Sequence, residues 1–256
     1  MKRWIVVDAG NTEVVVAAFH EEELAGRFAF ATPANITADE LALKCKQLAA
    51  EAGILGPVNG VLVGSVVPQL DAALREGLRR AFAAEVAFVG EAHVRTGLRI
   101  RYRQPKELGA DRVANAVAAK ALVGAPAVVV DCGTATTFDI VDEGGDYAGG
   151  LILPGPHMAL EALAARTAKL PKAPLARPQT LIGHDTIESI QAGVFWGHVA
   201  AIEGIAERLR AQLRAARFVL TGGLVPVFAD ALDIEARLEP ALTLIGLRLL
   251  AERRFP

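Results

Sequence analysis

The stretch that decides the fold is Trp4-Ile5-Val6-Val7-Asp8-Ala9-Gly10-Asn11-Thr12, a short apolar run that ends in an acidic residue and a turn. Such β-branched runs favour a buried strand, and a second apolar run follows at residues 14–19. The same order returns at Ala127-Val128-Val129-Val130-Asp131-Cys132-Gly133-Thr134-Ala135-Thr136 and in the run at residues 137–141. Asp8 and Asp131 are separated by nearly half of the 256-residue chain. A whole supersecondary unit is therefore interpreted as duplicated.

Later landmarks extend the two copies into an α/β fold. Each half carries a further strand that ends in small residues, Val61-Leu62-Val63-Gly64-Ser65 and Phe218-Val219-Leu220-Thr221-Gly222-Gly223. Helical patterns cover residues 38–53, 111–124 and 194–216, whereas the proline-rich residues 170–178 indicate a loop. Strands that alternate with helices predict an α/β protein of two similar lobes, residues 1–115 and 116–256.

The composition describes an ordinary globular protein. Hydrophobic residues make up 52% and charged residues 22%, and 27 Lys+Arg against 29 Asp+Glu give a net charge of −2. This balance argues against a dedicated nucleic-acid or membrane-surface binder. Two cysteines, Cys45 and Cys132, cannot build a disulfide framework, which favours a reducing, cytoplasmic setting. The first apolar run stops at Asp8, too early for a signal peptide, and no run reaches 18 apolar residues, so a soluble protein without a membrane span is expected.

The two Asp-x-Gly-x-Thr turns indicate phosphate handling. Glycine lets the backbone approach a ligand closely, and the residues after it supply hydroxyl, amide and backbone N–H donors. A carboxylate buried at a strand end is costly unless it is paired or holds a cation. One such turn alone is also a common structural turn; two in register favour a ligand. The sequence has no G-x-x-x-x-G-K-[ST] and no strand-linked G-x-G-x-x-G, so ATP must be bound in another way.

Longer motifs in a fixed order resemble type III pantothenate kinases, of the acetate and sugar kinase/Hsp70/actin superfamily. Besides the two turns, the matching motifs are Gly64-Ser65-Val66-Val67-Pro68, residues 102–115, Gly149-Gly150-Leu151-Ile152-Leu153-Pro154-Gly155, Thr167-Ala168-Lys169-Leu170-Pro171, Ile182-Gly183-His184-Asp185-Thr186, Gln191-Ala192-Gly193 and Thr221-Gly222-Gly223. The resemblance implies a duplicated RNase H-like fold with the active site in a cleft between two lobes. It also implies ATP-dependent phosphorylation of pantothenate to 4′-phosphopantothenate, the first step toward coenzyme A. A homodimer and a need for K⁺ or NH₄⁺ beside Mg²⁺-ATP are implied as well.

The resemblance also implies roles for the residues that match the family's motifs. Asp111 is the implied general base, and Asp131 the implied ligand of the monovalent cation. The implied ATP-binding residues are Asp8, Ala9, Gly10, Asn11, Thr12, Glu13, Val14, Val15, Thr134, Gly222 and Gly223. The implied pantothenate pocket lies at the subunit interface and consists of Tyr102, Gly109, Ala110, Asp111, Arg112 and, from the partner subunit, Thr186.

The chemistry of these residue types agrees with those roles. A primary alcohol that attacks a γ-phosphoryl group needs positioning and charge neutralisation above all. The ionised form of Asp111 is favoured at a helix start, and the neighbouring Arg112 offers a fork to a carboxylate. The alternative for Asp111 is a plain N-cap, worth roughly 1 kcal/mol.

Other features have simpler interpretations beside functional ones. One basic stretch is interpreted as a strand with outward charges rather than a nucleic-acid site; it contains Arg95, Arg99, Arg101, Arg103 and Lys106. A second basic set is interpreted as a solvated helix face; it consists of Arg208, Arg210, Arg214 and Arg217. No histidine spacing is typical of zinc, Cys132 need not be catalytic, and Phe195 and Trp196 are expected in the core or the dimer seam. Roles for His157 and His184 stay open. The competing functions are a kinase of another small alcohol or carboxylate and a non-catalytic accessory protein.

Overall fold

The computed structural model describes residues 2–54 and 56–256. These residues form two compact units: unit 1 extends to Ala121 and is completed by Ala241–Pro256, and unit 2 is Leu122–Pro240. The division differs from the expected boundary after residue 115, and the last segment belongs with unit 1. The reason is apolar packing, because Leu244, Leu247 and Leu250 join the buried cluster that contains Trp4 and Val6 of the first strand.

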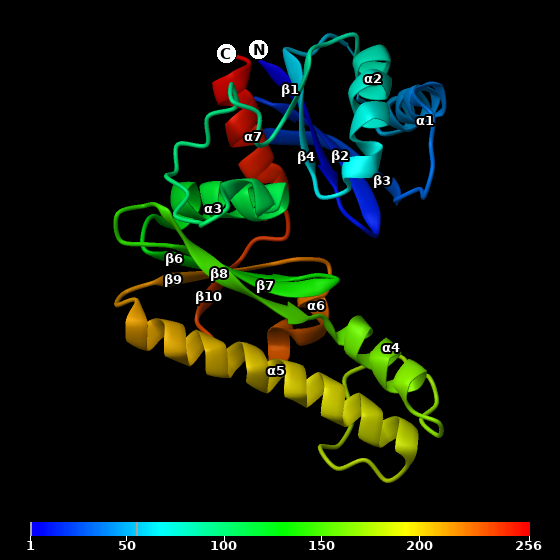
Figure 1. Cartoon of the computed structure of the whole chain (residues 1–256), viewed down its shortest axis with the longest axis vertical. Helices are drawn as coiled ribbons and strands as arrows, with labels where there is room; N and C mark the ends of the chain where they lie inside the picture. The colour runs from blue at the N-terminus through cyan, green and yellow to red at the C-terminus, as the bar shows by residue number, and fades with distance from the viewer. Residues whose placement is uncertain (1, 55) are drawn as a thin grey trace. The chain divides into compact units, whose positions relative to one another are not determined.

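Unit 1 is built on a five-stranded sheet of order β3-β2-β1-β4-β5 (Figure 1). Its strands are β1 (Arg3–Ala9), β2 (Glu13–His20), β3 (Glu23–Ala31), β4 (Gly60–Ser65) and β5 (Val86–Phe88). Its helices are α1 (Ala38–Glu51), α2 (Asp71–Phe82), α3 (Ala110–Val123) and α7 (Leu242–Arg254), with 3-10 turns η1 (Pro68–Leu70) and η2 (Pro105–Glu107). The central strand β1 runs antiparallel to β2 and parallel to β4.

Side chains of β1 alternate between two buried faces of that sheet. Ile5 and Val7 pack in the cluster that includes residues of α1 and α2, whereas Trp4 and Val6 pack with residues of α3 and α7. Figure 1 shows α7 against β1 on the side away from α1 and α2. The Trp4 Nε1–H group donates a hydrogen bond of 2.9 Å to the carbonyl oxygen of Phe255. Because both faces are covered, the first apolar run has no polar side, as expected for a buried strand.

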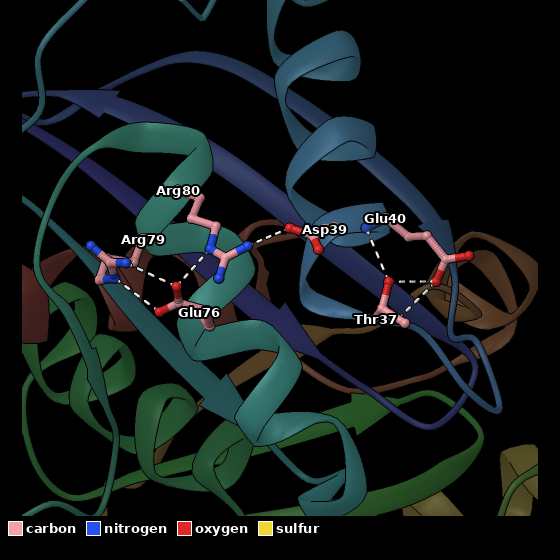
Figure 2. A network of polar contacts seen from close by, with 6 residues as sticks. All are labelled: Thr37, Asp39, Glu40, Glu76, Arg79 and Arg80. Carbon is pink, nitrogen blue, oxygen red and sulfur yellow. Dashed lines mark hydrogen bonds and ion pairs between the residues drawn. The ribbon is translucent and has the colours of Figure 1, made fainter.

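A polar network is added to the apolar contact between α1 and α2 (Figure 2). Thr37 and Glu40 form a capping box at the start of α1, in which each side chain accepts the other's backbone N–H. On α2, Glu76 accepts hydrogen bonds from Arg79 and Arg80, and these bonds lower the pKa of Glu76 to about 2. Arg80 also pairs with Asp39 of α1. The exposed Asp39–Arg80 pair of this network joins α1 to α2, whereas buried Leu41, Cys45, Leu74 and Leu78 form the apolar contact between the two helices.

Unit 2 repeats the sheet with the order β10-β9-β6-β7-β8. Its strands are β6 (Ala127–Cys132), β7 (Ala135–Val141), β8 (Tyr147–Pro154), β9 (Arg217–Thr221) and β10 (Ala236–Leu238). Its helices are α4 (Pro156–Arg166), α5 (Thr186–Gln212), α6 (Val225–Phe228) and the 3-10 turn η3 (Ala229–Ala231). Here β6 takes the place of β1, antiparallel to β7 and parallel to β9. The predicted duplication and the α/β fold class are confirmed.

The long helix α5 begins at Thr186, eight residues before the start that the sequence pattern predicted. The cause is a local cap: the Asp185 carboxylate accepts the Glu188 N–H at 2.8 Å, and the Glu188 carboxylate accepts the His184 N–H at 2.8 Å. Because residues 186–189 are exposed, this first turn adds no apolar periodicity that a sequence pattern would detect.

Two expectations for the basic residues are wrong. Residues 92–104 form turns and irregular backbone with an isolated bridge at Ile100, not a strand. Other hydrogen bonds are present there instead of a strand ladder: the Thr96 hydroxyl donates to the carbonyl oxygen of Leu98, and Arg253 of α7 donates to that of Thr96. Arg217 is not on a helix face: it begins β9, and its guanidinium donates to the carbonyl oxygen of Val123. No helix among the described residues is long and apolar enough to cross a membrane.

Candidate active site

The first candidate phosphate loop joins β1 to β2 in unit 1. Asp8 lies near the end of β1, in register with Val15 of β2 and Gly64 of β4. The Gly10 N–H donates to the carbonyl oxygen of Glu13 at 3.0 Å and closes the turn. Residues 11–13 are exposed, whereas Val14 is buried in β2. The sheet thus presents a short polar loop at the end of its central strand.

The start of α3 lies beside the end of β4, next to this loop. The Val66 N–H donates to the carbonyl oxygen of Ala9 at 3.0 Å. A β-carbon on Gly64 would lie 3.6 Å from Ala110 Cβ, and one on Gly109 would lie 3.4 Å from Val66 Cγ1. Unit 1 therefore brings the first loop and the segment from Gly109 into the same region.

Asp111 lies inside the first turn of α3, which begins at Ala110, and so is not the N-cap residue. Its Oδ1 accepts the backbone N–H of Arg112 at 2.8 Å. Gly109 leaves room for this carboxylate, because a β-carbon on Gly109 would lie 2.4 Å from Asp111 Oδ1. Burial raises the pKa of Asp111, and the Arg112 N–H and guanidinium partly oppose that rise. Arg112 itself is buried, with 6% of its surface exposed.

The second candidate loop, in unit 2, surrounds Asp131. This residue lies near the end of β6, in register with Thr137 of β7 and Thr221 of β9. Gly222 has φ of +102°, and a β-carbon there would lie 2.4 Å from Asp131 Oδ1 and 2.5 Å from the carbonyl oxygen of Cys132. The structure therefore gathers a carboxylate oxygen and a backbone oxygen against the Gly222 turn.

The rest of this loop is held by backbone contacts. The Gly133 N–H donates to the carbonyl oxygen of Ala135 at 3.1 Å, and Thr134 between them is exposed. Gly155 packs on the loop so closely that a β-carbon would lie 2.1 Å from the carbonyl oxygen of Thr134. Burial, followed by the Asp131 charge, raises the pKa of Cys132 to about 12, so its thiol stays protonated. This agrees with a packing role for Cys132.

Thr186 belongs to another part of unit 2. It lines an open pocket of about 680 Å³ at the start of α5 together with Leu163, Leu170 and His184. The structure does not group Thr186 with the Asp131 loop. Tyr102, which is half-buried, and Arg112 belong to unit 1. His157 lies in the first turn of α4 and is exposed.

Several residues that support these loops were not singled out from the sequence. The Ser65 hydroxyl donates to Asp71 Oδ1 at 2.6 Å and accepts the Val67 N–H at 3.2 Å, which fixes the turn after β4. One turn along α3 from Asp111, Asn115 Oδ1 accepts the Thr243 hydroxyl at 2.8 Å. Ser65 and Asn115 lie in motifs that carried the resemblance, so a signal for them was present, although without a role.

Two copies of a mixed five-stranded sheet, each with an acidic loop at the end of its central strand, define the fold of the actin-like ATPases and sugar kinases. The fold resembles a solved polyphosphate/ATP-glucomannokinase from Arthrobacter sp. strain KM (15% identity, TM-score 0.50, 99% of this chain and 100% of the other). It also resembles a Campylobacter jejuni protein described as a Baf family transcriptional activator (19% identity, TM-score 0.60, 97% of each chain).

The sequence places the chain more narrowly. The sequence model of the family described as type III pantothenate kinase matches residues 4–208. The type III pantothenate kinase of Moorella thermoacetica is 42% identical over 251 residues, which cover 97% of this chain and 98% of that protein. The chain belongs to the type III pantothenate kinase family, which confirms the resemblance that its motifs carry.

Proposed function

We propose that this protein transfers the γ-phosphoryl group of ATP to the primary hydroxyl of pantothenate, giving 4′-phosphopantothenate for coenzyme A synthesis, with Asp111 as the general base. Family membership supports the reaction. The observation that carries the role of Asp111 is its half-buried carboxylate at the start of α3, in the region where the end of β4 meets the first loop.

In the proposed mechanism Asp111 orients the pantothenate hydroxyl and accepts its proton as the bond to phosphorus forms. A base works best when its pKa is closer to the working pH, and burial moves the pKa of Asp111 in that direction. Arg112 directs its guanidinium charge to the pantothenate carboxylate, with Tyr102 and the backbone of residues 109–110 completing the pocket. Residues 8–15, Thr134 and the Gly222–Gly223 turn hold ATP.

The donor groups fit the two cations in the proposal. Among the described residues no group of three or more His, Cys, Asp or Glu side chains is close enough to hold a metal. Mg²⁺ commonly needs one or two carboxylates and takes its other ligands from phosphates and water, so Asp8 suffices. Bound there, Mg²⁺ would neutralise charge on the transferred group. The carboxylate oxygen of Asp131 and the backbone carbonyl oxygen of Cys132 lie beside Gly222, and both are suitable ligands for K⁺ or NH₄⁺.

The test is ADP release with purified protein, ATP and Mg²⁺, with and without pantothenate, and with K⁺, NH₄⁺ or Na⁺ as the monovalent ion. We expect turnover that requires pantothenate and is supported by K⁺ or NH₄⁺ but not by Na⁺. ATP binding without pantothenate-dependent turnover would contradict the function and favour another acceptor or an accessory binding role. Equal turnover rates in K⁺ and Na⁺ would contradict the proposed need for K⁺ or NH₄⁺ but not the proposed kinase activity.

The proposed assembly is a homodimer in which Thr186 of one subunit completes the pantothenate pocket of the other. Apolar side chains next to Thr186 in the chain support it: Leu181 and Ile182 are 71% and 72% exposed, and Ile187 is also exposed. Exposed apolar side chains gathered in one region are typical of protein interfaces. A second copy of the chain is the proposed partner.

Replacing Ile182 with aspartate is expected to dissociate this dimer. A charge at an apolar contact, introduced twice by two-fold symmetry, should raise the dimer dissociation constant by at least about a hundredfold. Analytical ultracentrifugation measures the dissociation constant, and the KM for pantothenate should rise with it. The matched control is Leu43→Asp, because Leu43 is 69% exposed on α1 of unit 1. A monomeric wild type, or an Ile182→Asp variant that stays dimeric, contradicts the proposed interface.

A further inference from the structure

Thr32, the residue that follows β3, contacts both ends of the first loop. Its hydroxyl donates a hydrogen bond of 2.5 Å to the carbonyl oxygen of Gly10. Its backbone N–H donates to the carbonyl oxygen of Thr12 at 3.0 Å. One residue from a neighbouring strand therefore fixes two loop carbonyls, and the hydroxyl bond is the one that only the side chain supplies.

The strand register and the residue after Thr32 explain why Thr32 lies beside the loop. The last register pair between β2 and β3 is Glu13 with Ala31, so Thr32 continues the strand past the ladder and alongside the loop. Pro33 follows it, and a residue before proline is restricted to extended backbone. The extended conformation keeps the Thr32 N–H in line with the ladder, where it meets Thr12.

The corresponding position in unit 2 has a different residue. There β7 and β8 end in the register pair of Ala135 with Pro154, so Gly155 corresponds to Thr32. The loop of unit 2 between paired residues is 133–135, one residue shorter than the loop of 10–13 in unit 1. Gly155 packs directly on the carbonyl oxygen of Thr134, with no room for a side chain. The longer loop of unit 1 instead receives a side-chain hydroxyl.

We propose that Thr32 is a positioning residue for ATP: its hydroxyl fixes the Gly10 carbonyl and thereby the conformation in which the exposed residues Asn11 and Thr12 meet the phosphates. The inference rests on the proposed function, in which residues 8–15 hold ATP. In the proposed mechanism Thr32 contacts neither ATP nor pantothenate. It acts through the loop, so its loss should weaken ATP binding and leave pantothenate binding unchanged.

The test compares wild type, Thr32→Val, which removes the hydroxyl and keeps the shape, and Thr32→Ser, which keeps the hydroxyl. Calorimetric titration with Mg²⁺ and a non-hydrolysable ATP analogue gives the nucleotide Kd, and turnover gives the KM for ATP and for pantothenate. For Thr32→Val we expect about a tenfold rise in the Kd and in the KM for ATP, since the lost hydrogen bond is to a loop that must be ordered. Thr32→Ser should stay within about threefold of wild type, and the KM for pantothenate should not move.

The outcomes separate this inference from the proposed function. Unchanged ATP affinity in Thr32→Val, or an equal rise in the KM for pantothenate, overturns the positioning role while wild-type turnover still supports the kinase. Wild-type protein that binds no ATP overturns both. Thermal unfolding without nucleotide is measured on each variant; if Thr32→Val does not fold, Thr32→Ala, which needs no added space, replaces it. Loss of ATP affinity in Thr32→Ser as large as in Thr32→Val also contradicts the role of the hydroxyl.

Discussion

Replacing Asp111 with asparagine is expected to lower kcat by about 10²–10⁴, the range for the loss of a general base. Asparagine retains the shape and an oxygen that can accept the Arg112 N–H, which Asp111 Oδ1 accepts at 2.8 Å. It cannot accept the hydroxyl proton. Steady-state turnover should therefore collapse, while the Kd of the ATP analogue stays within about twofold of wild type, a change below 0.5 kcal/mol.

The matched control for this variant is Asp39→Asn. Asp39 also lies in the first turn of a helix, but on α1, where it pairs with Arg80 on the exposed side. Surface ion pairs are worth little, so this variant should keep kcat near the wild-type value. A variant Asp111→Asn that keeps more than about a tenth of the wild-type kcat would contradict the assignment of the base.

The Asp111→Asn variant should also differ from wild type in thermal stability. Burial raises the folded-state pKa of Asp111 above its unfolded value, so folding favours the neutral acid. The stability that this residue contributes is present at pH below the unfolded pKa and is lost as the pH rises through the folded pKa. Asparagine stays neutral at every pH. Asp111→Asn should therefore unfold at a higher temperature than wild type near neutral pH, and the difference should shrink in acid. A difference that grows in acid contradicts the direction of the pKa shift.

Replacing Gly222 with alanine is expected to destabilise unit 2 at the Asp131 loop. The residue has φ of +102°, which L side chains rarely adopt, and its β-carbon would lie 2.4 Å from Asp131 Oδ1. Left-handed strain and overpacking each cost about 1–3 kcal/mol, so unfolding should become easier by roughly 3 kcal/mol or more. Displacement of Asp131 should also remove the response of turnover to K⁺.

Gly223→Ala is the control, because a β-carbon at Gly223 would have no neighbour within 4 Å and its φ is not positive. Thermal unfolding without ligand should place Gly222→Ala roughly 6–12 °C below wild type and Gly223→Ala close to wild type. Equal unfolding temperatures for the two variants would mean that the turn can move away from Asp131. Because Gly223 is itself a proposed ATP contact, the comparison is made on stability and not on turnover.

Short-range sequence patterns predicted several features of this protein. The repeat of Asp8 and Asp131 after β-branched runs predicted two equivalent strand ends, and the registers place both beside matching parallel strands. Motif order identified the family. The same motifs contained Gly109, whose missing side chain leaves room for the Asp111 carboxylate.

Other features depend on contacts that no local pattern encodes. The start of α5 is set by the Asp185 cap and not by apolar periodicity. The basic segment at residues 92–104 alternates in charge like a strand, yet its backbone groups bond within turns and to Arg253. The role of Thr32 follows from a strand register and a loop length, both of which arise only after the sheet has formed.

The return of α7 to unit 1 has a consequence for the order of events during synthesis. Unit 2 is continuous in the chain, whereas unit 1 is interrupted by it and is finished only by Ala241–Pro256. Gly246 of α7 packs so closely on α3 that a β-carbon would lie 2.0 Å from the carbonyl oxygen of Ala114. Domains fold as units while the ribosome works. The first strands of unit 1 emerge before unit 2, so the face of their sheet beneath Trp4 and Val6 stays uncovered until residues 241–256 have been translated.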